Sequence, residues 1–298
     1  MTATVVAVVI SYCPEVEALE SNLELIGRQT DAVIVIDNGS PEETVNRLSR
    51  VRSDVLDVVP LGYNAGIAKA QNLGIAAARE RGASHVVLFD QDSRPAAGMV
   101  QCLLRVLTSA DRLEGRVALA APNYVDDRHS ERIPFFRVID DLPQWFGCQS
   151  ERDVFDIDAA ISSGALISIA ALDEVGGMGE DLFIDMVDIE WCFRAKSLGF
   201  RFLGVCGAFL SHCLGEEPLI IAGRQVAVHS PLRNYYFFRN VVWMFRQDYV
   251  PRVWKRVLVS QMIKRYLLFS TCVAPRLSYF KEMTRGVWHG LRGRLGER

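Results

Sequence analysis

The chain has 298 residues, half of them hydrophobic, and its 33 basic side chains nearly balance its 36 acidic ones. That length is enough for one large α/β domain with an appendage, or for two small domains. It contains no uninterrupted apolar run of about 18 residues, which a membrane-spanning helix would need. The first twelve residues lack the basic region and cleavage site of a signal peptide, so we expect a cytoplasmic protein.

The charge is distributed unevenly along the chain. From Pro251 to Arg298 there are 11 Lys and Arg against 2 Glu, a net charge of +9, whereas the preceding 250 residues carry −12. A basic tail on an acidic body predicts contact with phosphates or with an anionic membrane surface.

The seven cysteines are scattered and include no Cys-x-x-Cys pair; they are Cys13, Cys102, Cys148, Cys192, Cys206, Cys213 and Cys272. An odd, scattered set is typical of reduced, mostly buried thiols in a cytosolic protein. We therefore expect neither a disulfide framework nor a zinc site.

The first predicted unit is a strand, a helix and a second strand. The apolar runs 5–11 and 32–36 are typical of buried strands, and apolar residues recur at helical spacing over residues 16–26. Because the joints are short, the unit should be a βαβ crossover with parallel strands. Asp37 ends the second strand, where its oxygens could bind a pyrimidine or a ribose; a turn residue before Asn-Gly is the simpler alternative.

A third strand, predicted over residues 55–61, leads into a glycine-containing turn. Gly62-Tyr63-Asn64-Ala65-Gly66 opens an Ala-rich helix that should run to about Arg81. The free N–H groups at the start of such a helix can meet a phosphate, and Lys69 lies one turn in. Loops of this kind are common, so this one is weak evidence by itself.

The segment HVVLFDQDSRP, from His85 to Pro95, joins an apolar strand directly to two acids. Asp90 and Asp92 are two residues apart, so they start from the same side of the strand's carboxyl end, where open α/β sheets bind ligands. Mg²⁺ usually takes one or two carboxylates together with substrate phosphates. The pattern therefore predicts a metal that holds a diphosphate, against the alternative of a solvated acidic loop.

Two less regular segments follow. Residues 124–153 are mixed in character and contain Pro134, Pro143, Trp145 and Gly147, which predicts an irregular loop that forms a lid or an acceptor-binding wall. Residues 157–169 are interpreted as a strand with a tight bend. Its small residues Ser163 and Gly164 would let a ligand approach the backbone closely.

The segment 180–200 carries Asp181, Asp185, Asp188 and Glu190 among bulky apolar side chains. A helix is predicted from Met186 to Leu198, and Asp185 and Asp188 should share one of its faces. Carboxylates beside apolar residues can hold a pKa useful for proton abstraction. Capping of the helix N-terminus is the alternative, and it explains one or two of the four acids but not all of them.

The last third of the chain contributes further candidates. His212 ends a predicted strand over residues 209–212; a satisfied core histidine is the usual interpretation, but imidazole is also a metal ligand. A helix is predicted from 229 to 240, with Arg233 and Arg239 either surface residues or phosphate ligands. The helix predicted over 253–268 mixes apolar and basic residues, which fits a membrane interface, packing against the body or a subunit contact.

Taken together, these segments resemble the family 2 inverting glycosyltransferases of the GT-A fold over residues 5–240. The resemblance is carried by VVISYCP, VIVIDNGS, GYNAGIAKAQNLGI, FDQDS and LFIDMVDIEWCFRAKSLGFR. Two positions depart from the family pattern, because Cys13 stands for the usual Asn and Val187 for the Glu of the usual Glu-Asp pair. The resemblance implies an α/β fold with a mostly parallel central sheet flanked by helices and a C-terminal helical extension.

The same resemblance implies roles for individual residues. Asp188 would be the catalytic base, and Mg²⁺ or Mn²⁺ would be held by Asp92 with Asp90 and His212. The nucleotide-sugar would be bound by Ser11, Tyr12, Asp37, Asn64, Gly66, Lys69, Asp90, Gln91, Arg233 and Arg239. The acceptor would be bound by Ser163, Gly164, Asp185 and Trp191.

Three segments of this chain, IDMVDIEWC, SHCLGE and RNYYFFRN, are most similar to the corresponding motifs of the bacterial rhamnosyltransferase branch. Members of that branch use dTDP-L-rhamnose to build rhamnolipids, O-antigens or other cell-surface polysaccharides. The expected function is therefore metal-dependent, inverting transfer of L-rhamnose to a hydroxyl of a glycolipid or polysaccharide precursor. Residues 1–230 would form the catalytic domain. Residues 231–298 would form a basic helical extension that contacts the membrane, the acceptor or another subunit.

We expect a cytoplasmic enzyme that is peripheral at the inner face of the cell membrane, that can form homo-oligomers and that binds no nucleic acid. Two alternatives stay open: a glycosyltransferase with a UDP-hexose donor, and a catalytically silent nucleotide-sugar-binding module. The presence of both Asp92 and Asp188 argues against the silent module. The segment after the first strand excludes a nucleotide-sugar pyrophosphorylase and a dinucleotide oxidoreductase, because it has neither a Gly- and Lys-rich loop nor G-x-G-x-x-G.

Overall fold

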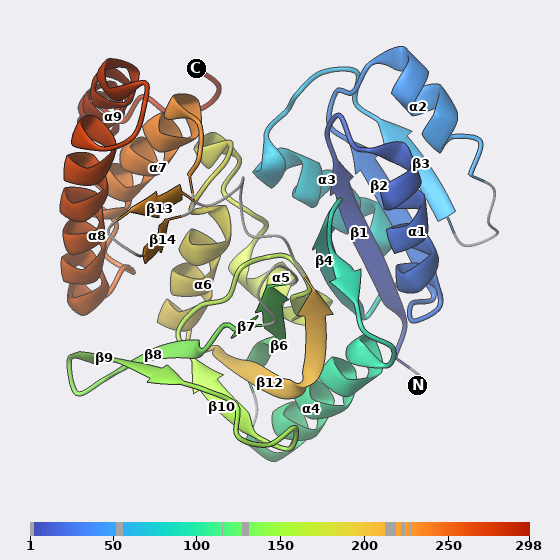
Figure 1. The fold of residues 1–298 in the computed structure, drawn as a ribbon. Coiled ribbons are helices and arrows are strands. Elements are labelled where there is room, and N and C mark those ends of the chain that lie inside the picture. Colours follow the sequence, from blue (N-terminus) through green and yellow to red (C-terminus); the bar gives the residue numbers. More distant parts are fainter. Residues whose placement is uncertain are drawn as a thin grey trace.

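A computed structural model describes residues 3–51, 56–114, 116–126, 131–211, 219–221, 224–226 and 228–298 (Figure 1). The described helices are α1 (Val16–Gly27), α2 (Glu42–Leu48), α3 (Ile67–Glu80), α4 (Met99–Glu114), α5 (Ile169–Val175), the 3₁₀ helix η1 (Glu180–Leu182), α6 (Val187–Ser197), α7 (Pro231–Met244), α8 (Arg252–Thr271) and α9 (Arg276–Leu291). The described strands are β1 (Val5–Ser11), β2 (Ala32–Asp37), β3 (Leu56–Pro60), β4 (His85–Asp90), β5 (Arg94–Pro95), β6 (Val117–Asp126), β7 (Glu131–Arg132), β8 (Phe135–Ile139), β9 (Leu142–Phe146), β10 (Val154–Ile157), β11 (Leu166–Ser168), β12 (Arg201–Ser211), β13 (Leu219–Ile221) and β14 (Arg224–Val226).

The fold is the predicted α/β architecture, with a mostly parallel central sheet flanked by helices. The main strand order is β10-β12-β6-β11-β4-β1-β2-β3. β3, β2, β1 and β4 run parallel to one another, β6 is parallel to β12, and β11 runs antiparallel between β4 and β6. The register places Ser11 opposite Asp37 and Ile10 opposite Asp90, so the carboxyl ends of β1, β2 and β4 meet at one edge.

Side-chain alternation divides the core into two layers, one on each face of the sheet. Along β1, Val6 and Val8 face the helices α3, α5 and α6, whereas Val5 and Ala7 face α1 and α4. A strand that is buried on both faces needs apolar residues at every position, and this explains the unbroken run VVAVVI. Just after α6, Gly199 adopts a φ of 85°, the left-handed conformation that commonly ends a helix.

The three C-terminal helices pack together beside the sheet (Figure 1). Pro231 starts α7, and the Ser230 side chain caps it by accepting a hydrogen bond from the Arg233 N–H at 3.3 Å. α9 approaches α7 closely because Gly286 and Gly290 lack side chains. A Cβ at either glycine would lie 2.5 Å from the Tyr235 or Arg239 carbonyl oxygen.

Trp254 links these helices to the sheet domain. Its indole N–H donates to the buried carboxylate of Asp158 at 2.9 Å, and its ring contacts Phe136 and Phe193 at centroid distances of 4.8 and 5.1 Å. Asp158 also accepts from the Val138 N–H at 2.9 Å and pairs with Lys196. α8 is therefore tied to β8 and α6 through one buried carboxylate.

Within the described residues, no helix is long and apolar enough to cross a bilayer.

Several sequence-based expectations were wrong in detail. The described residues within 124–153 form strands over much of their length rather than an irregular loop, because β6 continues to Asp126 and β8 and β9 form an antiparallel hairpin. Residues 157–169 are not one bent strand, since a connection separates β10 from β11. The strand expected over 209–212 is, as far as Ser211, the end of a longer strand, β12, whose register shifts between Val205 and Phe209.

The expectation of reduced cysteines was also wrong for one pair. Cys148 and Cys206 form a disulfide with their Cα atoms 5.6 Å apart. They are 58 residues apart in sequence, and only the folding of the segment after β9 against β12 brings them together. Spacing along the chain therefore carried no signal of this pairing.

The closest packing of α3 on the sheet supplies a stability test. A side chain at Gly74 would meet the Val8 side chain, because even a Cβ would lie 2.2 Å from Val8 Cγ1. We expect Gly74→Val to lower the free energy of unfolding by about 1–3 kcal/mol through overpacking. Ala76→Val, at an exposed position of the same helix, is the control and should cost less than about 1 kcal/mol. Equal melting temperatures for the two variants would contradict this packing.

Candidate active site

A cleft of about 900 Å³ opens at the edge where the carboxyl ends of β1 and β4 meet. It is lined by the ends of these strands, the turn before α3, residues 161–163, the segment 183–189 and the start of α7. The predicted site residues that line it are Tyr12, Asn64, Gly66, Asp90, Gln91, Asp92, Ser163, Asp185, Asp188 and Arg233. The sequence thus identified residues from six separate segments that the fold brings to one place.

Other predicted site residues lie outside the cleft lining. Ser11 and Asp37 are buried beneath it. The Lys69 ammonium lies 5.9 Å from the centroid of the Tyr63 ring. Gly164 packs against Pro122 and Leu210. Trp191 is a core residue, whose indole N–H donates to the Gly176 carbonyl at 2.9 Å. His212 lies outside the described residues.

Asp37 organises the turn after β2. Its carboxylate accepts hydrogen bonds from the Ser40 N–H at 2.9 Å and from the hydroxyls of Ser40 and Ser11 at 2.6 and 3.0 Å. The cleft is instead lined by Asn38, which donates to the Asn64 side chain and accepts from the Ala65 N–H. Sequence analysis did not single out Asn38, although the quoted motif VIVIDNGS contains it.

Gly66 allows the segment before α6 to cross the start of α3. It adopts a φ of 82°, and a Cβ there would lie 2.6 Å from the Phe183 ring. The next residue, Ile67, donates its N–H to the Phe183 carbonyl at 2.7 Å. The glycine-containing turn therefore shapes the cleft wall as well as starting a helix.

Asp90 and Asp92 both line the cleft at the end of β4. The intervening Gln91 accepts a hydrogen bond from the Tyr12 N–H at 2.8 Å, which ties the ends of β4 and β1 together. Within the described residues, no three His, Cys, Asp or Glu side chains converge as a self-contained metal site. Two carboxylates fit a hard divalent cation that completes its coordination with diphosphate oxygens and water.

Asp188 lies in the first turn of α6 and also lines the cleft. Its two oxygens accept hydrogen bonds from the N–H groups of Ile189 at 2.8 Å and Ser162 at 3.1 Å. Burial raises the pKa of Asp188 to about 6; these hydrogen bonds oppose the rise, and the nearby negative charge of Asp90 adds to it. A carboxylate with this pKa is suited to accept a proton near neutral pH.

The segment before α6 has an unusual backbone. Phe183, Asp185 and Met186 all have φ values of 64–65°, a conformation that non-glycine residues rarely adopt. Asp185 therefore precedes the helix, and the expectation that it shares a helical face with Asp188 was wrong. Its carboxylate instead forms an ion pair with Arg233 of α7 at 2.7 Å.

Buried donors from α7 hold this segment. The Asn240 side-chain amide donates to the carbonyls of Leu182, Ile184 and Asp185 at 3.0, 2.9 and 2.8 Å. Arg239 donates to the Leu182 carbonyl at 2.7 Å and also bonds the Gly296 carbonyl. Both side chains are fully buried, so Arg239 lies away from the cleft rather than where a phosphate ligand was predicted. We call Arg239 and Asn240 the clamp.

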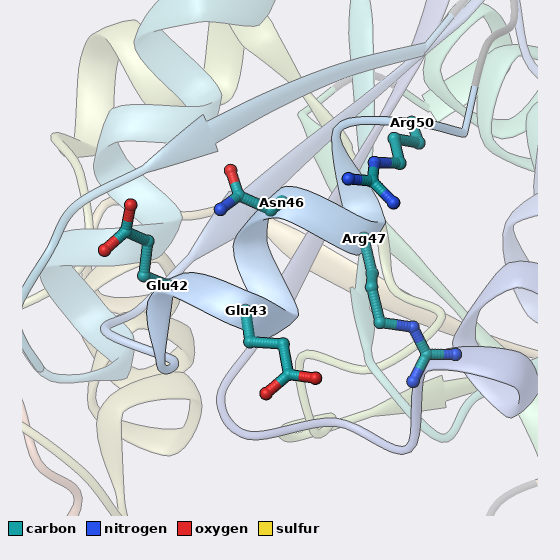
Figure 2. A pocket seen from close by; sticks show the side chains of 5 residues that line it. All are labelled: Glu42, Glu43, Asn46, Arg47 and Arg50. Carbon is teal, nitrogen blue, oxygen red and sulfur yellow. The ribbon is translucent and has the colours of Figure 1, made fainter.

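A second surface depression lies on α2 (Figure 2). Its lining consists of Glu42, Glu43, Asn46, Arg47 and Arg50. Figure 2 shows these side chains spread along an exposed short helix rather than directed at one point. Arg47 already forms an ion pair with Glu17 at 2.5 Å, so this hollow offers no assembled chemistry.

The clamp predicts a local loss of order when it is removed. Asn240→Ala would remove the donor from the carbonyls of Ile184 and Asp185, while the Leu182 carbonyl keeps its hydrogen bond from Arg239, and we expect the free energy of unfolding to fall by about 1–3 kcal/mol. Amide hydrogen exchange over residues 181–186 should accelerate. Asn46→Ala, on the exposed face of α2, is the control. Unchanged exchange in the Asn240 variant would show that the clamp does not hold the segment.

Comparisons with known proteins identify the family of the chain. Residues 7–147 match the family model described as "Glycosyl transferase family 2". The chain is 30% identical over 298 residues to "dTDP-rhamnosyl transferase RfbF" of Shigella flexneri, which covers 99% of this chain and 98% of the relative. It is 22% identical over 269 residues to "Low-salt glycan biosynthesis hexosyltransferase Agl10" of Haloferax volcanii, covering 89% and 84%.

Solved structures show the same fold. GalNAc-T7 with UDP, GalNAc and Mn²⁺ aligns with a TM-score of 0.60 at 14% identity, covering 97% of this chain and 56% of that chain. TarS of S. aureus aligns with a TM-score of 0.56 at 15% identity, covering 91% and 46%. This chain thus spans about half the length of each, and both likenesses support the GT-A fold. From the family model and the full-length relative, we conclude that the chain is a glycosyltransferase and belongs to glycosyltransferase family 2.

Proposed function

We propose that this enzyme transfers L-rhamnose from dTDP-L-rhamnose to a hydroxyl of a glycolipid or cell-surface polysaccharide precursor, with inversion and with a divalent cation. The donor is supported by the near-complete alignment with the Shigella flexneri dTDP-rhamnosyl transferase. The observation that carries the mechanism is that Asp188, with its raised pKa, lines the same cleft as Asp90 and Asp92.

Asp188 acts as the base of a single displacement. The acceptor hydroxyl attacks the anomeric carbon from the face opposite the diphosphate, and its proton passes to the Asp188 carboxylate. The new carbon–oxygen bond forms as the bond to the diphosphate oxygen breaks, so the configuration at the anomeric carbon inverts. No second carboxylate is needed as a nucleophile, in contrast to retaining mechanisms.

Asp90 and Asp92 are the residues that would hold Mg²⁺ or Mn²⁺. Such a cation, when bound, screens the negative charge that develops on the diphosphate leaving group. Arg233 reaches the cleft from α7 and supplies a positive charge beside it, while the Ser162 and Ile189 N–H groups keep the Asp188 carboxylate oriented. The predicted roles of Lys69 and His212 remain proposals.

We also propose that residues 1–230 form the catalytic domain and that the basic helices after residue 230 contact an anionic membrane surface where the acceptor is anchored. The net charge of +9 from Pro251 onward supports this placement. A homo-oligomer is compatible with the same helices. A UDP-hexose donor is the alternative, supported by the weaker similarity to the Haloferax hexosyltransferase.

A donor screen tests the proposed reaction. Binding and turnover should be measured for dTDP-L-rhamnose, dTDP-glucose, UDP-glucose, UDP-galactose and GDP-mannose, each with Mn²⁺ and with EDTA. We expect preference for dTDP-L-rhamnose, loss of turnover in EDTA and loss in Asp92→Ala, since a cation carboxylate would be missing. Preference for a UDP-sugar would refute the rhamnose donor. Donor binding without any turnover would support the silent module.

The pH dependence of the reaction tests the role of Asp188. Burial raises the pKa of this carboxyl to about 6, and only its ionised form accepts a proton. We expect kcat/KM to fall about tenfold per pH unit below pH 6, because the base is then protonated in the free enzyme. Donor binding measured across the same range separates this effect from loss of the substrate. A profile that stays flat down to pH 4.5 or so would contradict the assignment.

A further inference from the structure

The two last helices expose apolar side chains on their outer surface. On α8, Val259, Ile263 and Leu267 recur every four residues, so they form one stripe along the helix. On α9 the exposed apolar residues are Leu277, Phe280, Trp288 and Leu291. All seven are between 41 and 64% exposed, and together we call them the docking face. Trp254 and Leu258 of the same helix α8 are buried and do not belong to this face.

The stripes of α8 and α9 belong to one surface. Tyr266 of α8 contacts the Phe280 ring at a centroid distance of 5.8 Å, and its hydroxyl lies 2.8 Å from that of Thr284. Figure 1 shows α8 and α9 at the outer edge of the molecule, with α7 on their inner side. The inner sides of both helices already bury Leu258, Phe269 and Met283 in a core with α7. The docking face is therefore apolar surface that this core does not use.

Basic side chains surround the docking face. The exposed ones on the two helices are Arg252, Arg256, Lys264, Arg276, Lys281 and Arg285, and the exposed Arg292 directly follows α9. Arg292 lies over the Trp288 ring, 3.9 Å from its centroid, which places a cation beside an aromatic ring suited to a membrane interface. The one carboxylate on α9, Glu282, is paired with Arg285 and Arg298, and Asp141 of the β8–β9 hairpin lies 3.7 Å from Arg256. The surface keeps a large positive excess.

We propose that the docking face binds the surface of an anionic phospholipid bilayer. The apolar side chains would enter the boundary between headgroups and acyl chains, and the surrounding Lys and Arg would meet lipid phosphates. A second copy of the chain is a poorer occupant, because a symmetric contact would place the same cationic surfaces against each other. The inference rests on the proposed function for the location of the acceptor, and it identifies the residues that reach the membrane.

Docking would also position the cleft. α9 packs on α7 so closely that Gly286 and Gly290 contact its backbone, which makes the two helices one unit. α7 in turn contributes Arg233 and Phe237 to the cleft lining. The surface that contacts lipid and the wall of the active site are thus parts of the same helical unit.

Vesicle flotation of the full chain tests this inference. The probes are vesicles of phosphatidylcholine alone and of phosphatidylcholine with phosphatidylglycerol. We expect binding to the anionic vesicles, weakened by salt, and a fall of about tenfold or more in the double variant Ile263→Gln/Leu267→Gln. Leu113→Gln, which changes a residue 84% exposed on α4, is the matched control and should bind like the wild type.

Two results would overturn the inference. One is equal vesicle binding by the double variant and the wild type. The other is a wild-type dimer in light scattering that becomes a monomer in the double variant, without vesicle binding by either, which would assign the face to a second copy. Donor binding measured on the same samples separates the two proposals. A loss of vesicle binding with unchanged donor binding concerns only the docking face, and a failed donor screen concerns only the reaction.

Discussion

The active-site geometry depends on the buried hydrogen bonds between the clamp and the segment that precedes α6. Three non-glycine residues in four adopt left-handed backbone conformations there, at a cost of about 1–3 kcal/mol each. The Asn240 amide and the Arg239 guanidinium offset that cost by satisfying carbonyls that burial would otherwise leave without donors. The same segment directs Asp185 toward Arg233 and fixes where α6 begins, and hence where Asp188 lies.

The electrostatics of the cleft follow from this arrangement. Asp188 is held close enough to Asp90 for the two negative charges to interact, and burial keeps the pKa of Asp188 high. With a cation bound, Asp90 and Asp92 would serve the diphosphate leaving group, and Asp188 would serve the acceptor hydroxyl. The arrangement therefore fits a single displacement better than simple binding, which would not need Asp188.

The sequence predicted the parts of this site that depend on local pattern. The apolar runs of β1, β2 and β4 and the acids that follow them specify strands whose carboxyl ends meet, and Asp188 followed from its motif. Asp185 and Arg239 could not be placed from sequence, because helical periodicity assumes ordinary backbone angles and motif position does not reveal burial. The Cys148–Cys206 pair and the β8–β9 hairpin likewise arise from contacts between distant segments, which no local pattern records.

The most direct test of the account is a comparison of donor binding and sugar transfer in Asp188→Asn, with Asp181→Asn as a control at an exposed acid nearby. The substitution keeps the shape of the side chain and removes its ability to accept a proton. If Asp188 is the base, the donor should bind within about twofold of wild type while transfer falls by about 10²–10⁴-fold, and Asp181→Asn should behave as wild type. Transfer within a few-fold of wild type in Asp188→Asn would contradict the central claim.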